Sequence, residues 1–155
     1  MKHFILLALF GLTSLGRSQT TVYFVKADGT KDTDNYESYE QGSGKIYSCY
    51  KCKENGKDKE LLVGTNLDVQ GSKIYIFGRK PDRTGKDTTK VFEPKIIKVG
   101  FLMPNKKIVE EIDGKASKYK SAWIKDNKIY SPDGKLIAII DGEEIYGAAF
   151  YLLTK

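Results

Sequence analysis

Histidine is almost absent from this chain, because His3 is the only one among 155 residues. It lies in a short basic start, which an apolar run from Phe4 to Leu15 and then small polar residues follow. That order is typical of a secretory signal peptide. The small residues Gly16 and Ser18 predict cleavage after Ser18. The mature chain would then contain no histidine, which excludes Ser-His-Asp and Cys-His catalysis and every histidine-containing metal site.

Long apolar runs are also lacking after residue 18, and none approaches the ~20 residues of a transmembrane helix. We therefore expect no transmembrane span. No cysteine lies near the cleavage point, so we expect no lipid anchor there either. Residues 1–18 are predicted to be a signal peptide and residues 19–155 a single domain, which can bury its own core. The expected location is the periplasm or the medium.

The excess of positive charge is small. The formal net charge of +6 falls to +4 when Lys2 and Arg17 leave with the signal peptide. Such a balance favours solubility and loose attraction to anions, and it does not indicate a specific nucleic-acid partner. We expect a monomer.

Cysteine is scarce as well: the chain has two, Cys49 and Cys52. In an oxidising compartment two cysteines usually pair. Along one straight strand their Cα atoms would stand roughly 10 Å apart, beyond the ~7 Å that a disulfide allows. Either the chain turns between them or both thiols are free. We predict a local disulfide; a redox role is disfavoured because no helix follows, and two thiols alone predict no metal site.

No segment keeps a helical period of 3.6 residues over three turns. Instead, short runs rich in β-branched and aromatic residues recur at intervals of about 8–12 residues, separated by Asp-Gly and Asn-Gly pairs, which predicts an all-β barrel or sandwich. The segment 106–115 fits a strand better than a short helix. The acidic segment 31–44 and the basic segment 79–90 are expected to be exposed loops. The strands are predicted at 20–25, 44–53, 60–64, 72–79, 94–103, 106–115, 121–130, 135–142 and 144–153.

A short motif repeats along the chain. Lys-Ile-Tyr stands at 45–47, 73–75 and 128–130, and Glu-Ile-Tyr at 144–146. Since side chains alternate along a strand, Ile and Tyr of each copy face opposite sides. Self-similarity of this kind predicts a small quasi-symmetric β-barrel built of repeated hairpin units. A β-sandwich, or hairpins that are not true repeats, are the alternatives.

The stretch "DNKIYSPDGKLIAIIDGEEIYG" with the tail "AAFYLL" resembles the β-flower families of small secreted or membrane-tethered bacterial proteins. The match is best over residues 127–153 and looser over 107–114. The resemblance implies a shallow, roughly rotationally symmetric β-barrel with an apolar central channel. The biochemical role of those families is unsettled, so they supply a fold and no mechanism. A more distant likeness to tubby-type barrels that bind lipid head groups is an analogy of fold alone.

No catalytic motif is visible. In each of the carboxylate pairs Glu110-Glu111 and Glu143-Glu144, the two side chains would point to opposite faces of a strand. The two members of a pair therefore cannot act together as a general acid and a general base. Residues 78–89 miss the spacing of a phosphate-binding loop. The acids between residues 28 and 36 miss the glycine of a calcium loop. We therefore predict a protein that is not an enzyme and uses neither metal nor cofactor.

Aromatic side chains supply the candidate site. We predict that five of them line a channel, a ligand site or the core: Trp123, Tyr130, Tyr146, Phe150 and Tyr151. Trp123 is expected in the core. The tail 147–153 has too many consecutive apolar residues for an exposed strand, so we expect it inside the barrel.

These observations favour a secreted, non-enzymatic β-barrel module that binds a small apolar or amphipathic ligand, a lipid or a cell-surface partner. One alternative is a hydrolase or lyase that uses carboxylates and tyrosine. Another is a periplasmic inhibitor or partner-binding protein.

Overall fold

The computed structural model describes residues 18–51, 53–54, 57–58, 60–64, 67–78 and 95–154. The expected signal peptide and the basic segment 79–90 lie outside these ranges. Within them the chain forms thirteen strands and then one helix. The strands are β1 (Gln19–Val25), β2 (Lys31–Glu40), β3 (Lys45–Tyr50), β4 (Lys53–Glu54), β5 (Lys57–Asp58), β6 (Leu61–Gly64), β7 (Leu67–Gln70), β8 (Lys73–Gly78), β9 (Lys95–Leu102), β10 (Lys107–Ile112), β11 (Lys115–Lys125), β12 (Lys128–Tyr130) and β13 (Leu136–Asp141), and the helix is α1 (Glu144–Leu153).

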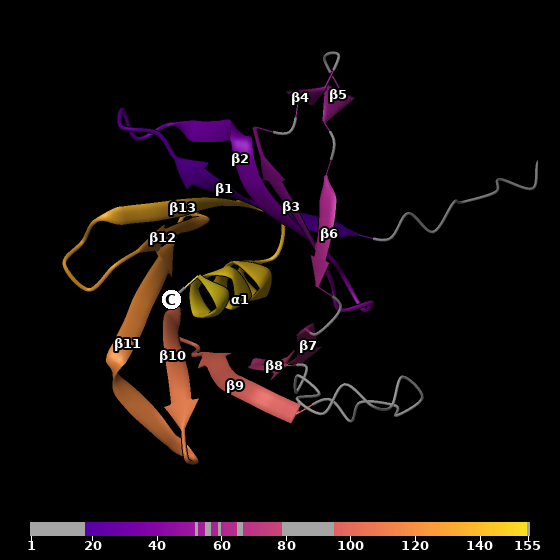
Figure 1. The fold of residues 1–155 in the computed structure, drawn as a ribbon. Helices are drawn as coiled ribbons and strands as arrows, with labels where there is room; N and C mark the ends of the chain where they lie inside the picture. Colours follow the sequence, from indigo (N-terminus) through magenta and orange to yellow (C-terminus); the bar gives the residue numbers. More distant parts are fainter. Residues whose placement is uncertain are drawn as a thin grey trace, which may run out of the picture.

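Eleven of these strands form one antiparallel sheet in the order β6-β3-β2-β1-β13-β12-β11-β10-β9-β8-β7. The sheet curls around α1 into a nearly closed barrel (Figure 1). The short strands β4 and β5 pair in a separate two-stranded sheet. The prediction of an all-β barrel is confirmed, in place of the β-sandwich. A quasi-symmetric origin from repeated units stays a prediction.

The sheet ends at β6 and β7, two strands that follow each other in the chain. At this seam the backbone N–H of Leu67 donates to the carbonyl oxygen of Gly44, in the turn between β2 and β3, at 3.4 Å. Gly44 has a φ of +69°, and a Cβ there would lie 2.3 Å from the oxygen of Leu67. Glycine is therefore needed for the two segments to approach so closely.

One hairpin has the predicted kind of tight turn, and a similar turn divides the segment 121–130, so the prediction of a single strand there was wrong. Asp113 and Gly114 both adopt positive φ (51° and 74°) between β10 and β11, as a type I′ turn requires. Asp126 and Asn127 do the same between β11 and β12 without a glycine. The pair Asp141-Gly142 instead leads into α1, so it closes no hairpin.

The acidic segment 31–44 is not a loop, and this prediction was wrong. Residues 31–40 form β2, which pairs with β1 on one side and β3 on the other, and residues 41–44 alone make the turn. Tyr36, Ser38 and Tyr39 are buried there. The acids are compatible with a strand because Asp32 and Asp34 lie toward its start, where the side chains are not fully buried.

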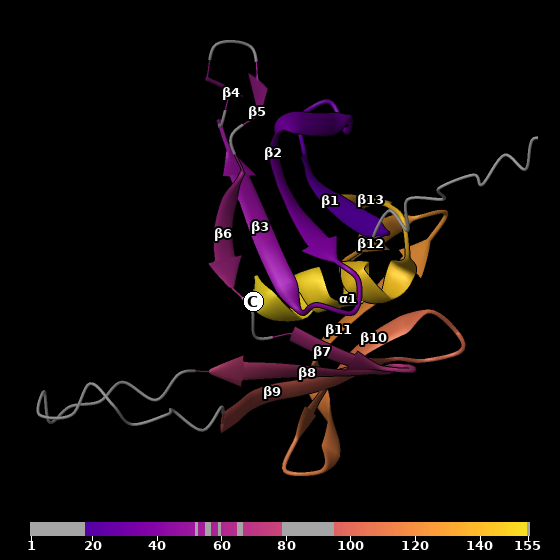
Figure 2. The ribbon, with the colours of Figure 1, turned by 90° about the vertical axis from the view of Figure 1, so that its right-hand side faces the viewer.

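The tail is a helix and not the strand that we expected from residues 144–153. Residues 146–152 of α1 are all buried, so the expectation that the tail lies inside the barrel is confirmed. A helix that is apolar on every side shows no amphipathic period, which is why periodicity missed it. Figure 2 shows α1 lying lengthwise between the wall of β1–β3 and the wall of β7–β11. The middle of the barrel therefore holds a helix where the resemblance implied a channel.

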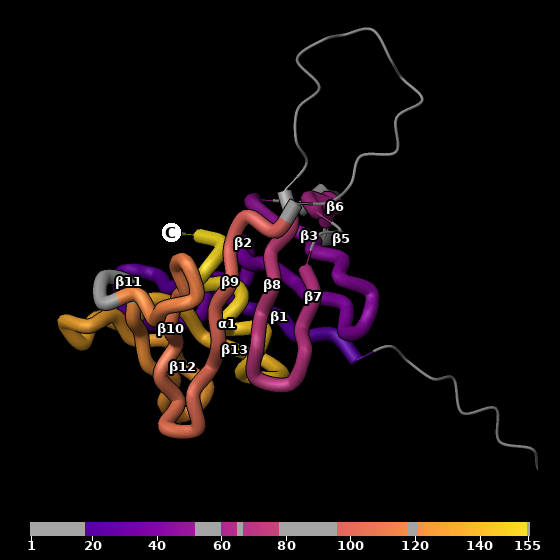
Figure 3. The backbone as a smooth tube through the Cα atoms, turned by 90° about the horizontal axis from the view of Figure 1, so that it is seen from below, coloured from indigo at the N-terminus to yellow at the C-terminus, as the bar shows by residue number. Residues whose placement is uncertain are grey.

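Glycine in α1 allows close contact with the wall. A Cβ on Gly147 would lie 2.3 Å from Cδ1 of Ile140 on β13. The strands β7 to β10, which run side by side in Figure 3, cover the other side of the helix. Their inward residues include Ile74, Ile76 and Ile108, which join the same hydrophobic core.

Candidate functional site

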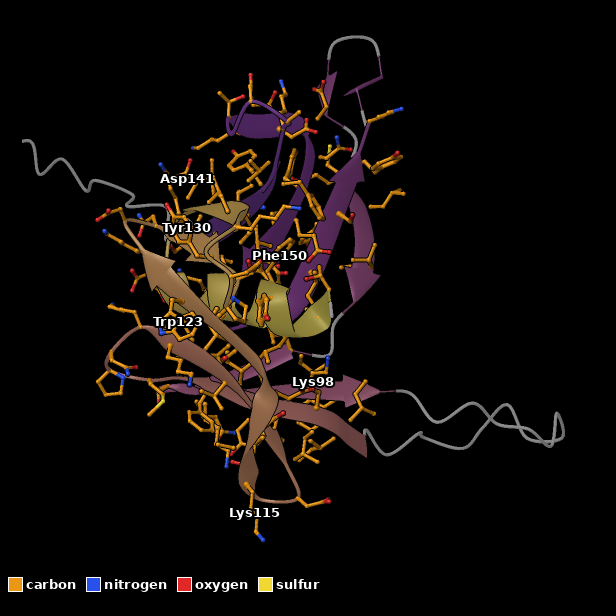
Figure 4. All side chains as sticks on the ribbon, turned by 90° about the vertical axis from the view of Figure 1, so that its left-hand side faces the viewer. Lys98, Lys115, Trp123, Tyr130, Asp141 and Phe150 are labelled. Atoms are coloured by element: carbon orange, nitrogen blue, oxygen red, sulfur yellow. The ribbon has the colours of Figure 1, made fainter. Side chains whose placement is uncertain are left out.

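Two of the five predicted aromatic residues lie together on the outside of the barrel. Trp123 on β11 and Tyr130 on β12 are directly opposed in the register of the two strands, so their side chains stand on one face. Their neighbours Ala122, Ile124 and Ile129 are fully buried and point inward. Trp123 keeps 38% of its surface exposed, and Figure 4 labels both residues on this side of the barrel.

The expectation that Trp123 belongs to the core was therefore wrong. Alternation along β11 allows either the Ala122 and Ile124 set or the Trp123 set to face inward. The helix α1 packs against this wall, and small Ala122 takes the inward position. Without knowing that a helix fills the barrel, the larger ring was the natural choice for the core.

A row of outward residues extends across four strands at this point. Lys107 on β10 opposes Trp123, Trp123 opposes Tyr130, and Tyr130 opposes Leu136 on β13. The ammonium group of Lys107 lies 5.5 Å from the centroid of the Trp123 ring, within the range of a cation–π contact. We call the set Lys107, Trp123, Tyr130 and Leu136 the outer aromatic row.

The other three predicted residues belong to α1 and lie in the core. Tyr146 packs at 6.0 Å between ring centroids against Tyr39, and Phe150 meets Phe24 edge to face at 5.2 Å. Tyr151 donates its hydroxyl hydrogen bond to the backbone oxygen of Ser121 at 3.3 Å. These rings fill the barrel, whereas Trp123 and Tyr130 lie outside it.

The interior also holds a charged cluster that the sequence analysis missed. Lys98 on β9 donates a hydrogen bond to the backbone oxygen of Leu152, in the last turn of α1. Its ammonium group lies 3.7 Å from Oε1 of Glu110 on β10, and the two side chains are only 20% and 8% exposed. Burial, and then the nearby charge of Glu110, raise the pKa of Tyr151. Lys98 and Glu110 are charged residues at inward positions of two neighbouring strands, and this pattern was the sequence signal that could have predicted the cluster.

A second interior carboxylate belongs to Glu37 on β2. The hydroxyl of Tyr39 donates to Oε2 of Glu37 at 2.5 Å. Burial raises the pKa of Glu37, and the hydrogen bond from Tyr39 opposes that rise. Burial also raises the pKa of Tyr39 far above its ordinary value. Tyr39 is completely buried, so this pair is better suited to holding the wall together than to meeting a substrate.

Cys49 is buried on β3 and is disulfide-bonded. Cys52 lies outside the described residues, so its pairing with Cys49 stays a prediction. Among the residues that the structure covers, no group of three or more acids, cysteines or histidines could hold a metal ion. In the same part of the chain, no helix is long and apolar enough to span a membrane.

Comparison of the chain with family models, with curated proteins and with solved structures finds no match.

Proposed function

We propose that this protein is a secreted, non-enzymatic binding module that holds an amphipathic ligand or a surface partner on the outer wall of its barrel. The observation that carries the proposal is the outer aromatic row, in which Trp123 and Tyr130 are directly opposed and Trp123 is partly exposed. Exposed Trp and Tyr side chains present an apolar body together with a polar tip, and so suit ligands with both kinds of surface.

The location of α1 supports an outer site. The helix occupies the middle of the barrel, and its residues Phe150, Tyr151 and Leu152 are at most 3% exposed. A ligand inside the barrel would have to displace these side chains from a packed core. On the outer wall, by contrast, the side chains of the row can meet a ligand without any change in the fold.

The rigidity of the wall favours binding as well. β10, β11, β12 and β13 each pair with a strand on both sides, so the backbone under the row is held by sheet hydrogen bonds. A backbone held in this way needs no further ordering when a ligand binds, which reduces the entropic cost of association.

Fluorescence tests this proposal directly, because Trp123 is the only tryptophan of the chain. Its emission is followed during titration with octyl glucoside, a small amphiphile, below the concentration at which micelles form. We expect a saturable change in emission that is lost in Tyr130→Ala. Tyr75→Ala is the matched control, since Tyr75 on β8 also lies under a lysine, Lys73. An emission that does not respond, or an equal effect of both variants, contradicts the proposal.

A further inference from the structure

Two lysines oppose each other beside the outer aromatic row. Lys125 on β11 and Lys128 on β12 are partners in the register, flanking the turn that joins the strands. Like charges in directly opposed positions destabilise a sheet. Trp123 and Tyr130 are the partners two residues farther along on the same face, roughly 7 Å away. An unfavourable pair of cations therefore adjoins an exposed aromatic pair.

Lys107 adds a third cation on the other side of Trp123. Elsewhere on the molecule, five lysines have carboxylate partners: Lys31, Lys45, Lys73, Lys98 and Lys106. Within the part of the chain that the structure describes, Lys107, Lys125 and Lys128 form no such ion pair. No carboxylate of this part of the chain thus neutralises the three ammonium groups, although that of Lys107 lies over the Trp123 ring.

We propose that this face binds a carboxylated oligosaccharide, with a sugar ring stacked on Trp123 and Tyr130 and its carboxylates held by Lys107, Lys125 and Lys128. The inference rests on the proposed function and specifies the ligand. The apolar face of a sugar ring matches an aromatic side chain, and a carboxylate accepts charge-assisted hydrogen bonds from ammonium groups. Binding also relieves the repulsion between Lys125 and Lys128.

The geometry favours a sugar over an acidic peptide or a membrane. An extended peptide binds a sheet through the unpaired backbone of an edge strand, and β10 to β13 are all interior strands of this sheet. Anchoring to a bilayer requires burial of a larger apolar face, whereas the large exposed apolar group of this row is Trp123.

The first experiment titrates the emission of Trp123 with oligogalacturonate and with its methyl ester, which keeps the sugar rings and removes the charge. We expect saturable binding of the acid and a dissociation constant at least about tenfold higher for the ester. Polyglutamate and vesicles of anionic lipid serve as polyanions without a sugar ring. They are expected to bind at least about tenfold more weakly than oligogalacturonate.

The second experiment compares two double variants that lose the same charge. Lys125→Gln/Lys128→Gln is expected to weaken oligogalacturonate binding about tenfold or more, with no loss of thermal stability because a repulsive pair is removed. Lys115→Gln/Lys135→Gln is the control, since both lysines are exposed at other turns. Its affinity should stay within about twofold of the parent.

The outcomes separate this inference from the function on which it rests. If acid and ester bind equally, or if octyl glucoside alone binds, the acidic ligand is wrong and the amphipathic binding module stands. If polyglutamate or vesicles bind as tightly as oligogalacturonate, the site is a simple cationic patch and the inference is overturned. If no ligand changes the emission of Trp123, both proposals fail.

Discussion

Lys98 reaches from the barrel wall to the end of the central helix, where its ammonium group donates to the backbone oxygen of Leu152. The last turn of α1 contains no basic residue of its own. The carbonyl groups there lack helical partners and carry the negative end of the helix dipole. Lys98 on β9 (labelled in Figure 4) thus supplies the positive charge and the hydrogen-bond donor that the last turn of the helix lacks. Glu110 balances the charge of this lysine.

Lys98→Met should therefore destabilise the protein strongly. The substitution leaves Glu110 buried without its lysine, which costs about 3–5 kcal/mol. Urea denaturation followed by circular dichroism measures the loss. Lys98→Met/Glu110→Leu should recover much of it, because an apolar pair can replace a buried ion pair.

The chain offers a matched control for that variant on the outer face of the sheet, where Lys73 on β8 pairs with Glu111 on β10. Lys73 and Glu111 are 3.5 Å apart, with side chains 41% and 22% exposed. Lys73→Met should cost no more than about 1 kcal/mol. Equal losses in the free energy of unfolding for Lys98→Met and Lys73→Met would show that the interior ion pair contributes no more to stability than the exposed one.

Glu37 predicts a specific dependence of stability on pH. Its pKa is raised in the folded state by burial, so folding favours the protonated form. The stabilisation from this group is fully present below the unfolded pKa of about 4.3 and is lost as the pH rises through the folded pKa. Glu37→Gln should thus unfold at higher urea concentrations than the parent at pH 7. At pH 4 the two proteins should differ little.

The control for Glu37 is Glu111→Gln, which removes a carboxylate paired with Lys73. At pH 7 this variant should be as stable as the parent or slightly less stable. The change in stability is thus opposite in direction to that expected for Glu37→Gln. A Glu37→Gln protein that is less stable than the parent at pH 7 would mean that the hydrogen bond from Tyr39 outweighs burial.

Removing residues 148–155 should abolish most of the stability. Phe150, Tyr151 and Leu152 are almost completely buried, and burying one large apolar side chain contributes about 1.5–3 kcal/mol. Their sum is a large part of a typical stability of 5–15 kcal/mol. Thermal unfolding followed by circular dichroism is the measurement. Removal of residues 154–155 alone is the control, and a shortened protein that melts within about two degrees of the parent contradicts a helix at the core.

The disulfide at Cys49 should be dispensable for folding. A loop as short as the one to Cys52 removes little entropy from the unfolded chain. Alanine is the better probe, because Cys49 is 1% exposed and serine would add a buried hydroxyl. Cys49→Ala/Cys52→Ala should lose less than about 3 kcal/mol in thermal unfolding, and a larger loss would make the bond structural.

Local patterns predicted most of the barrel. Runs rich in β-branched and aromatic residues predicted the strands at β1 and β13. The pair Asp113-Gly114 predicted the hairpin between β10 and β11, because its backbone conformation is a local property. Such signals are carried by a few consecutive residues. They needed no knowledge of the partner strands.

The errors at the tail and at Trp123 share one physical origin, which is the presence of α1 inside the barrel. A buried helix has no polar face, so residues 144–153 resembled a strand. The same helix explains why Ala122, and not Trp123, faces inward. Lys98 and Glu110 come together through the pairing of β9 with β10 and the position of α1, relations that no single segment contains.

The order of elements along the chain has a consequence for folding. β1 pairs with β13, as in the partners Val22 and Ile140, and α1 comes after every strand. The wall cannot be completed, nor the core filled, until the most distant parts of the chain have met. Contacts of such long range make folding slow, typically milliseconds to seconds. During that time the inner surfaces of the early strands face water, and such exposed apolar surface makes the incompletely folded chain prone to aggregation.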